Sequence, residues 1–178
     1  MRSLSMVGHV FLSTLLVACS SATYKKTVEK VERDRFMGTW YVMAGRFTVF
    51  EKDAFNATET YKWNQKEQRI DIKFQYNKGA LNGPKKKIPQ KGWIDDHQTN
   101  ATWKVSPIWP LKFGYLIIAL DSNYEWTAVG VPDEDYLWIM ARDPSMSREK
   151  VNEIIEKVRR EGYDTDDIVY VQHDQTKQ

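Results

Sequence analysis

The sequence contains very little cysteine and histidine and no uninterrupted apolar run long enough to cross a membrane. Its 178 residues include one cysteine and three histidines, and the formal net charge is +2. A single cysteine cannot form an intramolecular disulfide, so packing must hold the fold together. No spacing of His and Cys matches a metal site or a nucleophile with its base. The near-neutral charge, without a basic stripe, argues against a nucleic-acid partner. We therefore expect no metal, no cofactor, no nucleic-acid partner and no enzyme activity.

The first 18 residues have the composition of a leader rather than of a folded segment. Arg2 supplies a positive charge, and residues 7–17 are mostly apolar but too few to span a bilayer as a mature helix. We interpret residues 1–18 as a signal peptide.

The leader ends in Leu16-Val17-Ala18-Cys19, which resembles the lipobox of bacterial lipoproteins. This resemblance implies lipidation of the Cys19 thiol, cleavage before Cys19, and acylation of the new amino group. Ser20 in the next position implies sorting to the outer membrane, and two or more acyl chains make anchoring stable. The polar residues 19–31 are predicted to be a tether. The alternative is an ordinary secretory leader that is cut after Ala18 and followed by an incidental cysteine.

Alternating apolar and polar residues predict an all-β fold. The pattern is clearest in residues 70–77, where Ile70, Ile72, Phe74 and Tyr76 share one face. Strands are expected at residues 38–47, 56–63, 70–77, 87–94, 101–106, 114–121, 126–131 and 136–142. Eight strands joined by short turns favour an antiparallel up-and-down β-barrel, and eight is a number whose interior can hold one small ligand.

One helix is predicted near the C-terminus. Ser147 is a good N-cap, and Gly162 is expected to end the helix. Between them an apolar stripe with helical spacing, formed by Val151, Ile154, Ile155 and Val158, needs a surface to cover. We expect this helix to pack on the outside of the barrel, followed by a short edge strand at residues 168–171.

Two distant segments are expected to meet and close one end of the barrel. Gly38 and Trp40 open the first strand, and Arg142 ends the last one. A guanidinium lying on an indole contributes about 0.5–2 kcal/mol. Gly38, Trp40 and Arg142 are therefore predicted to close the barrel, which leaves the opposite end open.

These motifs resemble those of the lipocalin family, in particular the bacterial outer-membrane lipocalins related to apolipoprotein D. Three signatures occur in order: Gly38-Thr39-Trp40-Tyr41, the turn Ala119-Leu120-Asp121-Ser122-Asn123-Tyr124, and Arg142 in Ala141-Arg142-Asp143-Pro144. The resemblance implies a lipocalin domain over residues 32–175 and a protein anchored at the periplasmic face of the bacterial outer membrane. It also implies binding of fatty acids or lysophospholipids, for lipid storage or transport in envelope maintenance. A homodimer is a further expectation from relatives.

Alternation that starts from Trp40 and Arg142 predicts which side chains face the ligand. They are expected to be Val42, Ala44, Ile70, Ile72, Phe74, Tyr76, Trp103, Tyr115, Tyr136, Trp138 and Met140. Gly45 departs from the bacterial pattern and is expected to disturb the alternation beyond Ala44. Two alternatives to a lipid carrier remain: a lipocalin-fold enzyme acting on a lipid or isoprenoid, and an envelope interaction protein whose barrel is filled.

The open end is expected at residues 48–55, 78–86, 107–112 and 132–135. Lys78, Lys85, Lys86 and Lys87 either meet a phosphate or carboxylate there or form a solvated run. The apolar residues 107–111 contact the membrane, contact a dimer partner, or fold over the mouth. The sequence does not rank these alternatives.

Overall fold

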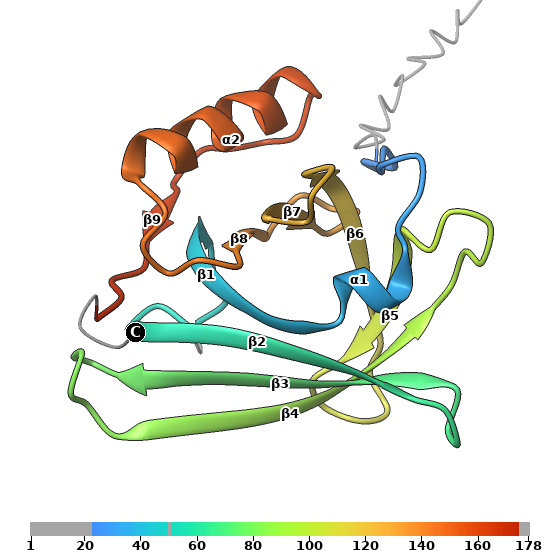
Figure 1. Cartoon of the computed structure of the whole chain (residues 1–178), viewed down its shortest axis with the longest axis horizontal. Helices are drawn as coiled ribbons and strands as arrows, with labels where there is room; N and C mark the ends of the chain where they lie inside the picture. The colour runs from blue at the N-terminus through green and yellow to red at the C-terminus, as the bar shows by residue number, and fades with distance from the viewer. Residues whose placement is uncertain (1–22, 50, 175–178) are drawn as a thin grey trace, which may run out of the picture.

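The computed structural model describes residues 23–49 and 51–174; Cys19 and the predicted leader lie outside the described residues. The chain forms a closed antiparallel barrel with a helix outside it, as predicted (Figure 1). The barrel strands are β1 (Gly38–Arg46), β2 (Ala54–Asn64), β3 (Arg69–Lys78), β4 (Lys85–Ile94), β5 (Thr102–Ser106), β6 (Phe113–Leu120), β7 (Trp126–Gly130) and β8 (Leu137–Ala141). The other elements are α1 (Arg33–Phe36), α2 (Arg148–Arg160) and β9 (Val169–Tyr170).

The barrel closes through β1, which has two partners on one of its sides. The first residues of β1, Gly38 to Tyr41, pair with Tyr61 to Thr58 of β2. Farther along, β9 pairs with β1 at Ala44 and Gly45. The segment after β9 continues this seam, because Val171 N donates to Met43 O (2.9 Å) and Asn56 N donates to Gln172 O (2.9 Å). The C-terminal segment thus fills the gap where β1 and β2 diverge.

Helix α2 lies against the outside of the barrel, as its apolar stripe predicted. Ser147 is the N-cap, and its Oγ accepts a hydrogen bond from Lys150 N at 3.2 Å. Gly162 has φ of +90° just beyond the last turn, a conformation that glycine adopts without strain. The apolar stripe of α2 is buried in an outer cluster with residues of β1, β6, β7 and β8. An inner cluster fills the barrel side of the same strands.

The chain before α1 packs on the barrel, which differs from the predicted tether. Tyr24 and Val31 are buried, and Val28 N donates to Ile117 O at 2.9 Å. Apolar side chains of this segment pack against the barrel, so the described part of residues 19–31 is held on the barrel rather than extended away from it. No helix within residues 23–49 and 51–174 is long and apolar enough to cross a membrane.

Candidate ligand-binding site

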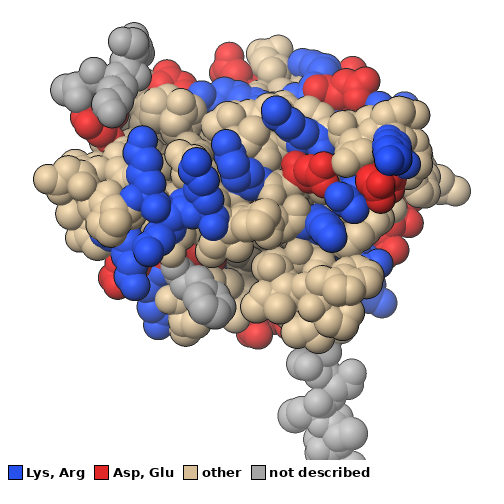
Figure 2. Space-filling model, turned by 90° about the horizontal axis from the view of Figure 1, so that it is seen from below, with Lys and Arg blue, Asp and Glu red and all other residues tan. Residues whose placement is uncertain are grey.

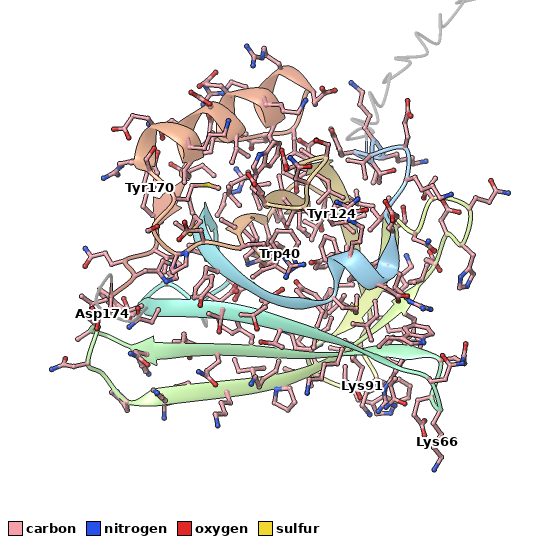
Figure 3. The ribbon with its side chains drawn as sticks, in the orientation of Figure 1. Trp40, Lys66, Lys91, Tyr124, Tyr170 and Asp174 are labelled. Atoms are coloured by element: carbon pink, nitrogen blue, oxygen red, sulfur yellow. The ribbon has the colours of Figure 1, made fainter. Side chains whose placement is uncertain are left out.

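The closed end of the barrel is built around Trp40 (Figure 3). Its ring is fully buried, and its Nε1 donates to Phe36 O at 2.8 Å. The guanidinium carbon of Arg142 lies 3.6 Å from the centre of the indole ring. The structure therefore brings together the two residues that the sequence placed about a hundred positions apart.

Arg142 also holds helix α1 in place. Its guanidinium nitrogens donate to Thr39 O (2.7 Å), Arg35 O (2.8 Å), Phe36 O (3.1 Å) and Met37 O (2.8 Å). Three of these carbonyls lie at the end of α1, where a helix has no intrahelical donors for them. Partial burial lowers the pKa of Arg142 to about 10, so its charge persists at neutral pH.

Gly38 makes room for this arrangement. Its φ is +98°, and a Cβ added to it would lie 3.3 Å from Arg142 Nη1. A residue with a side chain would be strained by the backbone conformation and crowded by the guanidinium. The three predicted closure residues therefore form one contact group.

The second lipocalin signature packs against the same end. The hydroxyl of Tyr124 accepts a hydrogen bond from Glu32 N at 2.8 Å, and the guanidinium carbon of Arg35 lies 4.1 Å from the centre of the Tyr124 ring. Asp121 Oδ2 accepts from Asn123 N at 2.9 Å and shapes the turn. All three signatures thus meet around α1.

Most of the predicted ligand-facing side chains lie on the inner wall. The inner cluster contains Val42, Ile70, Ile72, Phe74, Tyr76, Trp103, Tyr115 and Met140. Trp138 is partly buried and packs against this cluster. Near the closed end the rings pack on one another, with Trp103 stacked on Tyr115 at 5.1 Å between ring centres. Whether these residues bind a ligand stays a prediction.

Two predicted positions differ from the expectation. Ala44 belongs to the outer cluster under α2, because the register with β8 shifts between Val42 and Ala44 and the extra residue, Met43, reverses the alternation. Tyr136 lies just before β8 and is 36% exposed, with its ring 6.0 Å from that of Trp138. A β-bulge is the physical reason for the first difference. Tyr136 precedes the first residue of β8, so strand alternation does not set its direction.

The structure adds an interior polar group that the sequence reading missed. Glu59 of β2 is buried and accepts a short hydrogen bond from the Tyr61 hydroxyl. The hydroxyls of Tyr61 and Tyr115 are 2.7 Å apart. Ala57, Glu59 and Tyr61 alternate along β2 and face inward, so period-two spacing could have located Glu59.

Burial controls the ionisation of this group. The pKa of Glu59 is raised to about 7: desolvation is the largest cause, the hydrogen bond from Tyr61 lowers the pKa, and the nearby charge of Glu51 raises it. Desolvation also raises the pKa of the Tyr61 and Tyr115 hydroxyls, so both stay protonated and can donate. Glu59 is thus the interior group whose protonation changes near neutral pH.

A second carboxyl reaches the interior from the loop between β1 and β2. Glu51 Oε1 accepts a hydrogen bond from Trp138 Nε1 at 3.0 Å, and its Oε2 accepts from Thr48 Oγ1 at 2.8 Å. Burial raises the pKa of Glu51 although these hydrogen bonds lower it. Among the residues that the structure describes, the buried carboxyls are those of Glu51 and Glu59, and no Lys or Arg is buried.

Positive charge gathers at the predicted open end instead. Lys78, Lys85, Lys86 and Lys87 are all exposed at the ends of β3 and β4. The loop at residues 107–112 turns outward, where Trp109 lies 6.2 Å from Trp93 between ring centres. That loop therefore covers the outer wall rather than the mouth. Residues 23–49 and 51–174 contain no group of three His, Cys, Asp or Glu side chains that could hold a metal ion.

A closed barrel with an apolar inner wall defines a class of proteins that hold small molecules inside a β-barrel. Comparison with known proteins gives the family. The lipocalin-like domain model matches residues 31–173. Outer membrane lipoprotein Blc of Escherichia coli (strain K12) is 35% identical over 175 residues, which cover 97% of this chain and 98% of that protein. Outer membrane lipoprotein Blc of Citrobacter freundii is 34% identical over 178 residues, covering 96% and 97%.

The solved structure of apocrustacyanin C2 aligns with a TM-score of 0.64 at 13% identity, covering 82% of this chain and 81% of that one. At this identity the likeness concerns the fold alone. The family match and the sequence identity together show that the chain belongs to the lipocalin family. The predicted family and fold are confirmed.

Proposed function

We propose that this lipocalin is anchored to the outer membrane through acylated Cys19 and binds a fatty acid or lysophospholipid in its barrel, for lipid storage or transport. The single observation that carries the binding proposal is the inner wall, where buried apolar side chains from seven strands face one another above a sealed end. The lipoprotein relatives support the anchor, because they match this chain over nearly its full length, including the leader.

The energetics favour an acyl chain as the occupant. Burying about 14 methylenes at ~0.8 kcal/mol each gives roughly 11 kcal/mol. The loss of ligand motion on binding and the ordering of side chains cost several kcal/mol, so the expected affinity is in the micromolar to nanomolar range. An apolar wall holds chains of different lengths and saturation, so we expect selectivity to come from the polar groups.

The distribution of charge sets the orientation of the ligand. Glu51 and Glu59 would repel a carboxylate or phosphate that entered the barrel head first. Lys85, Lys86 and Lys87 would attract the same group at the open end. The ligand therefore enters tail first and keeps its anionic head at the lysines.

A titration tests the binding. A fluorescent fatty acid is added to the soluble form that lacks residues 1–19, with folding verified by circular dichroism and thermal unfolding. Saturation at one ligand per chain is the expected result. A folded protein that shows no saturable binding would refute the proposal.

A matched pair of variants locates the site. Ile72→Trp enlarges a side chain on the inner wall of β3 and should weaken binding at least about tenfold, because a methylene-sized loss of space already matters in packed interiors. Gln75→Trp places the same ring on the opposite face of that strand and should leave the affinity unchanged. Equal effects of both substitutions would place the ligand elsewhere.

A further inference from the structure

The wall of β2 to β5 carries a groove that is lined mainly by residues of its outer face, together with Ile72 of the inner cluster. Its volume is about 490 Å³, and its lining includes Lys62 of β2, Lys73 of β3, Lys91 of β4 and Trp109 of the β5–β6 loop. Figure 2 shows the molecule from below, with many Lys and Arg side chains on this face. Lys91 projects from the lower side of β4 in Figure 3, away from Trp40.

The groove keeps a net positive charge. In the part of the chain that the structure describes, Lys62, Lys73 and Lys91 form no salt bridge. The lining carboxylate, Asp71, accepts hydrogen bonds from Arg69 Nε and Asn64 Nδ2, each at 2.8 Å. The hydrogen bond from Arg69 is the largest cause that lowers the pKa of Asp71, and the charge of Lys91 also lowers it. Lys62, Lys73 and Lys91 outnumber this one lining carboxylate.

A buried hydroxyl without a partner also lines the groove. Ser106 is 4% exposed, and its Oγ has no hydrogen-bond partner within the described residues. A buried hydroxyl that donates to nothing costs free energy. The hydroxyl oxygen is enclosed by protein, so an oxyanion seated among the three lysines contacts their ammonium groups and not this hydroxyl.

An exposed apolar loop borders the groove. Of the eight large apolar side chains that are exposed among the described residues, four lie in six consecutive positions: Ile108, Trp109, Leu111 and Phe113. Trp109 is 64% exposed, and the Lys91 ammonium lies 5.9 Å from its ring centre. A patch that combines exposed apolar side chains with ammonium groups suits a lipid surface, where the apolar part inserts below anionic headgroups.

The chain toward Cys19 leaves the barrel beside this loop. Tyr24 N donates to Pro132 O at 2.8 Å. A Cβ on Gly114, the residue after Phe113, would lie 2.5 Å from Pro132 Cδ. Cys19 is five residues before Tyr24, so an anchor there is at most about 18 Å from Tyr24.

We propose that this outer-wall groove and the apolar loop Ile108–Phe113 form a membrane-docking face that binds the headgroup of an anionic phospholipid. The lysines hold the phosphate oxygens, and the loop side chains enter the apolar layer. This inference rests on the Cys19 anchor of the proposed function, which brings the face to the bilayer. The protein would then have a lipid site outside the barrel and would lie on the membrane in one orientation.

Thiol accessibility tests the docking face. The full chain is processed from its own leader and reconstituted into vesicles of phosphatidylethanolamine and phosphatidylglycerol. Leu111→Cys then offers a single free thiol, because Cys19 is the sole native cysteine and is acylated. Lys66→Cys, in the exposed turn between β2 and β3, is the matched control (Figure 3). Reaction with a membrane-impermeant maleimide should be at least about tenfold slower at position 111 than at position 66.

Charge variants test the headgroup. Each lysine near an anionic surface favours docking about fivefold, so K73Q/K91Q should lower the ratio of docked to undocked chains roughly thirtyfold and expose position 111. Lys66→Gln should leave the ratio of docked to undocked chains, and the reactivity of position 111, unchanged. Unfolding midpoints of K73Q/K91Q and Lys66→Gln are compared to show that the groove variant is folded.

The other occupants give different results. Position 111 could be protected from the maleimide equally well in phosphatidylcholine vesicles, or could stay protected in K73Q/K91Q. Either result would refute the binding of an anionic headgroup. Protection in detergent that rises with protein concentration would assign the face to a second copy of the chain. Loss of protection on adding soluble glycerol phosphate would assign the groove to a free anion. Reaction of the parent chain itself would refute the Cys19 anchor, whereas a reactive Leu111→Cys in an unreactive parent background refutes the docking face alone.

Discussion

The buried carboxyl of Glu59 should make the barrel less stable as the pH rises through neutrality. Its pKa is about 7 in the folded protein against 4.5 for an ordinary glutamate. The folded state therefore binds more protons than the unfolded state between these values, and the free energy of unfolding falls with rising pH. The contribution is fully present below pH ~4.5 and is lost as the pH passes about 7.

The size of the effect follows from the two pKa values. Between pH 5 and pH 8, Glu59 should remove about 2.5 kcal/mol from the free energy of unfolding. Glu59→Gln keeps the shape and still accepts the hydrogen bond from Tyr61, but it does not titrate. The variant should therefore lose about 2.5 kcal/mol less than the parent over the same interval.

Urea unfolding of the soluble form at pH 5, 6, 7 and 8 measures this difference. Glu29→Gln is the control, because Glu29 is an exposed carboxyl in the segment before α1. Its pH dependence should match that of the parent. Parallel pH profiles for the parent and Glu59→Gln would show that Glu59 is solvated in the folded protein, and the description of Glu59 as a buried carboxyl with a raised pKa would be wrong.

Three further substitutions have expected outcomes. Arg142→Met removes the hydrogen bonds from the guanidinium to the carbonyls of α1, so urea titrations should show a free energy of unfolding lower by about 2–3 kcal/mol. The control Arg160→Met, on the exposed side of α2, should change the free energy of unfolding by less than about 0.5 kcal/mol. Gly38→Ala should lower thermal stability by about 1–2 kcal/mol because of its positive φ, and an unchanged melting temperature would contradict the strain. Tyr61→Phe removes the donor to Glu59 and should cost about 1–3 kcal/mol at pH 8 but much less at pH 5; equal losses at both would exclude a role for the charged carboxyl.

Local patterns were sufficient for the elements that bury one regular face. The alternation from Ile70 to Tyr76 predicted β3, and the spacing from Val151 to Val158 predicted α2 with its N-cap at Ser147. Both predictions depend on side-chain periods that the backbone sets by itself.

Alternation failed where a strand departs from regular geometry. Ala44 has the same parity as Val42, yet Met43 is an extra residue opposite β8 and turns Ala44 toward α2. The sequence marked the region through Gly45, but the position of a bulge depends on the partner strand. Helix α1 was also missed, because four residues carry no periodic signal and its carbonyls are held by Arg142 from the far end of the chain.

The sequence by itself determined the strands, the external helix and the family, because these follow from side-chain periods and short motifs. Only the tertiary structure decided that Glu59 faces inward with Tyr61. It also decided that Trp109 and lysines from neighbouring strands line one groove, and that the segment at Tyr24 is hydrogen-bonded to Pro132. The physical reason is that the pKa of a carboxyl and the charge of a groove depend on neighbours from distant segments, which meet only when the barrel closes.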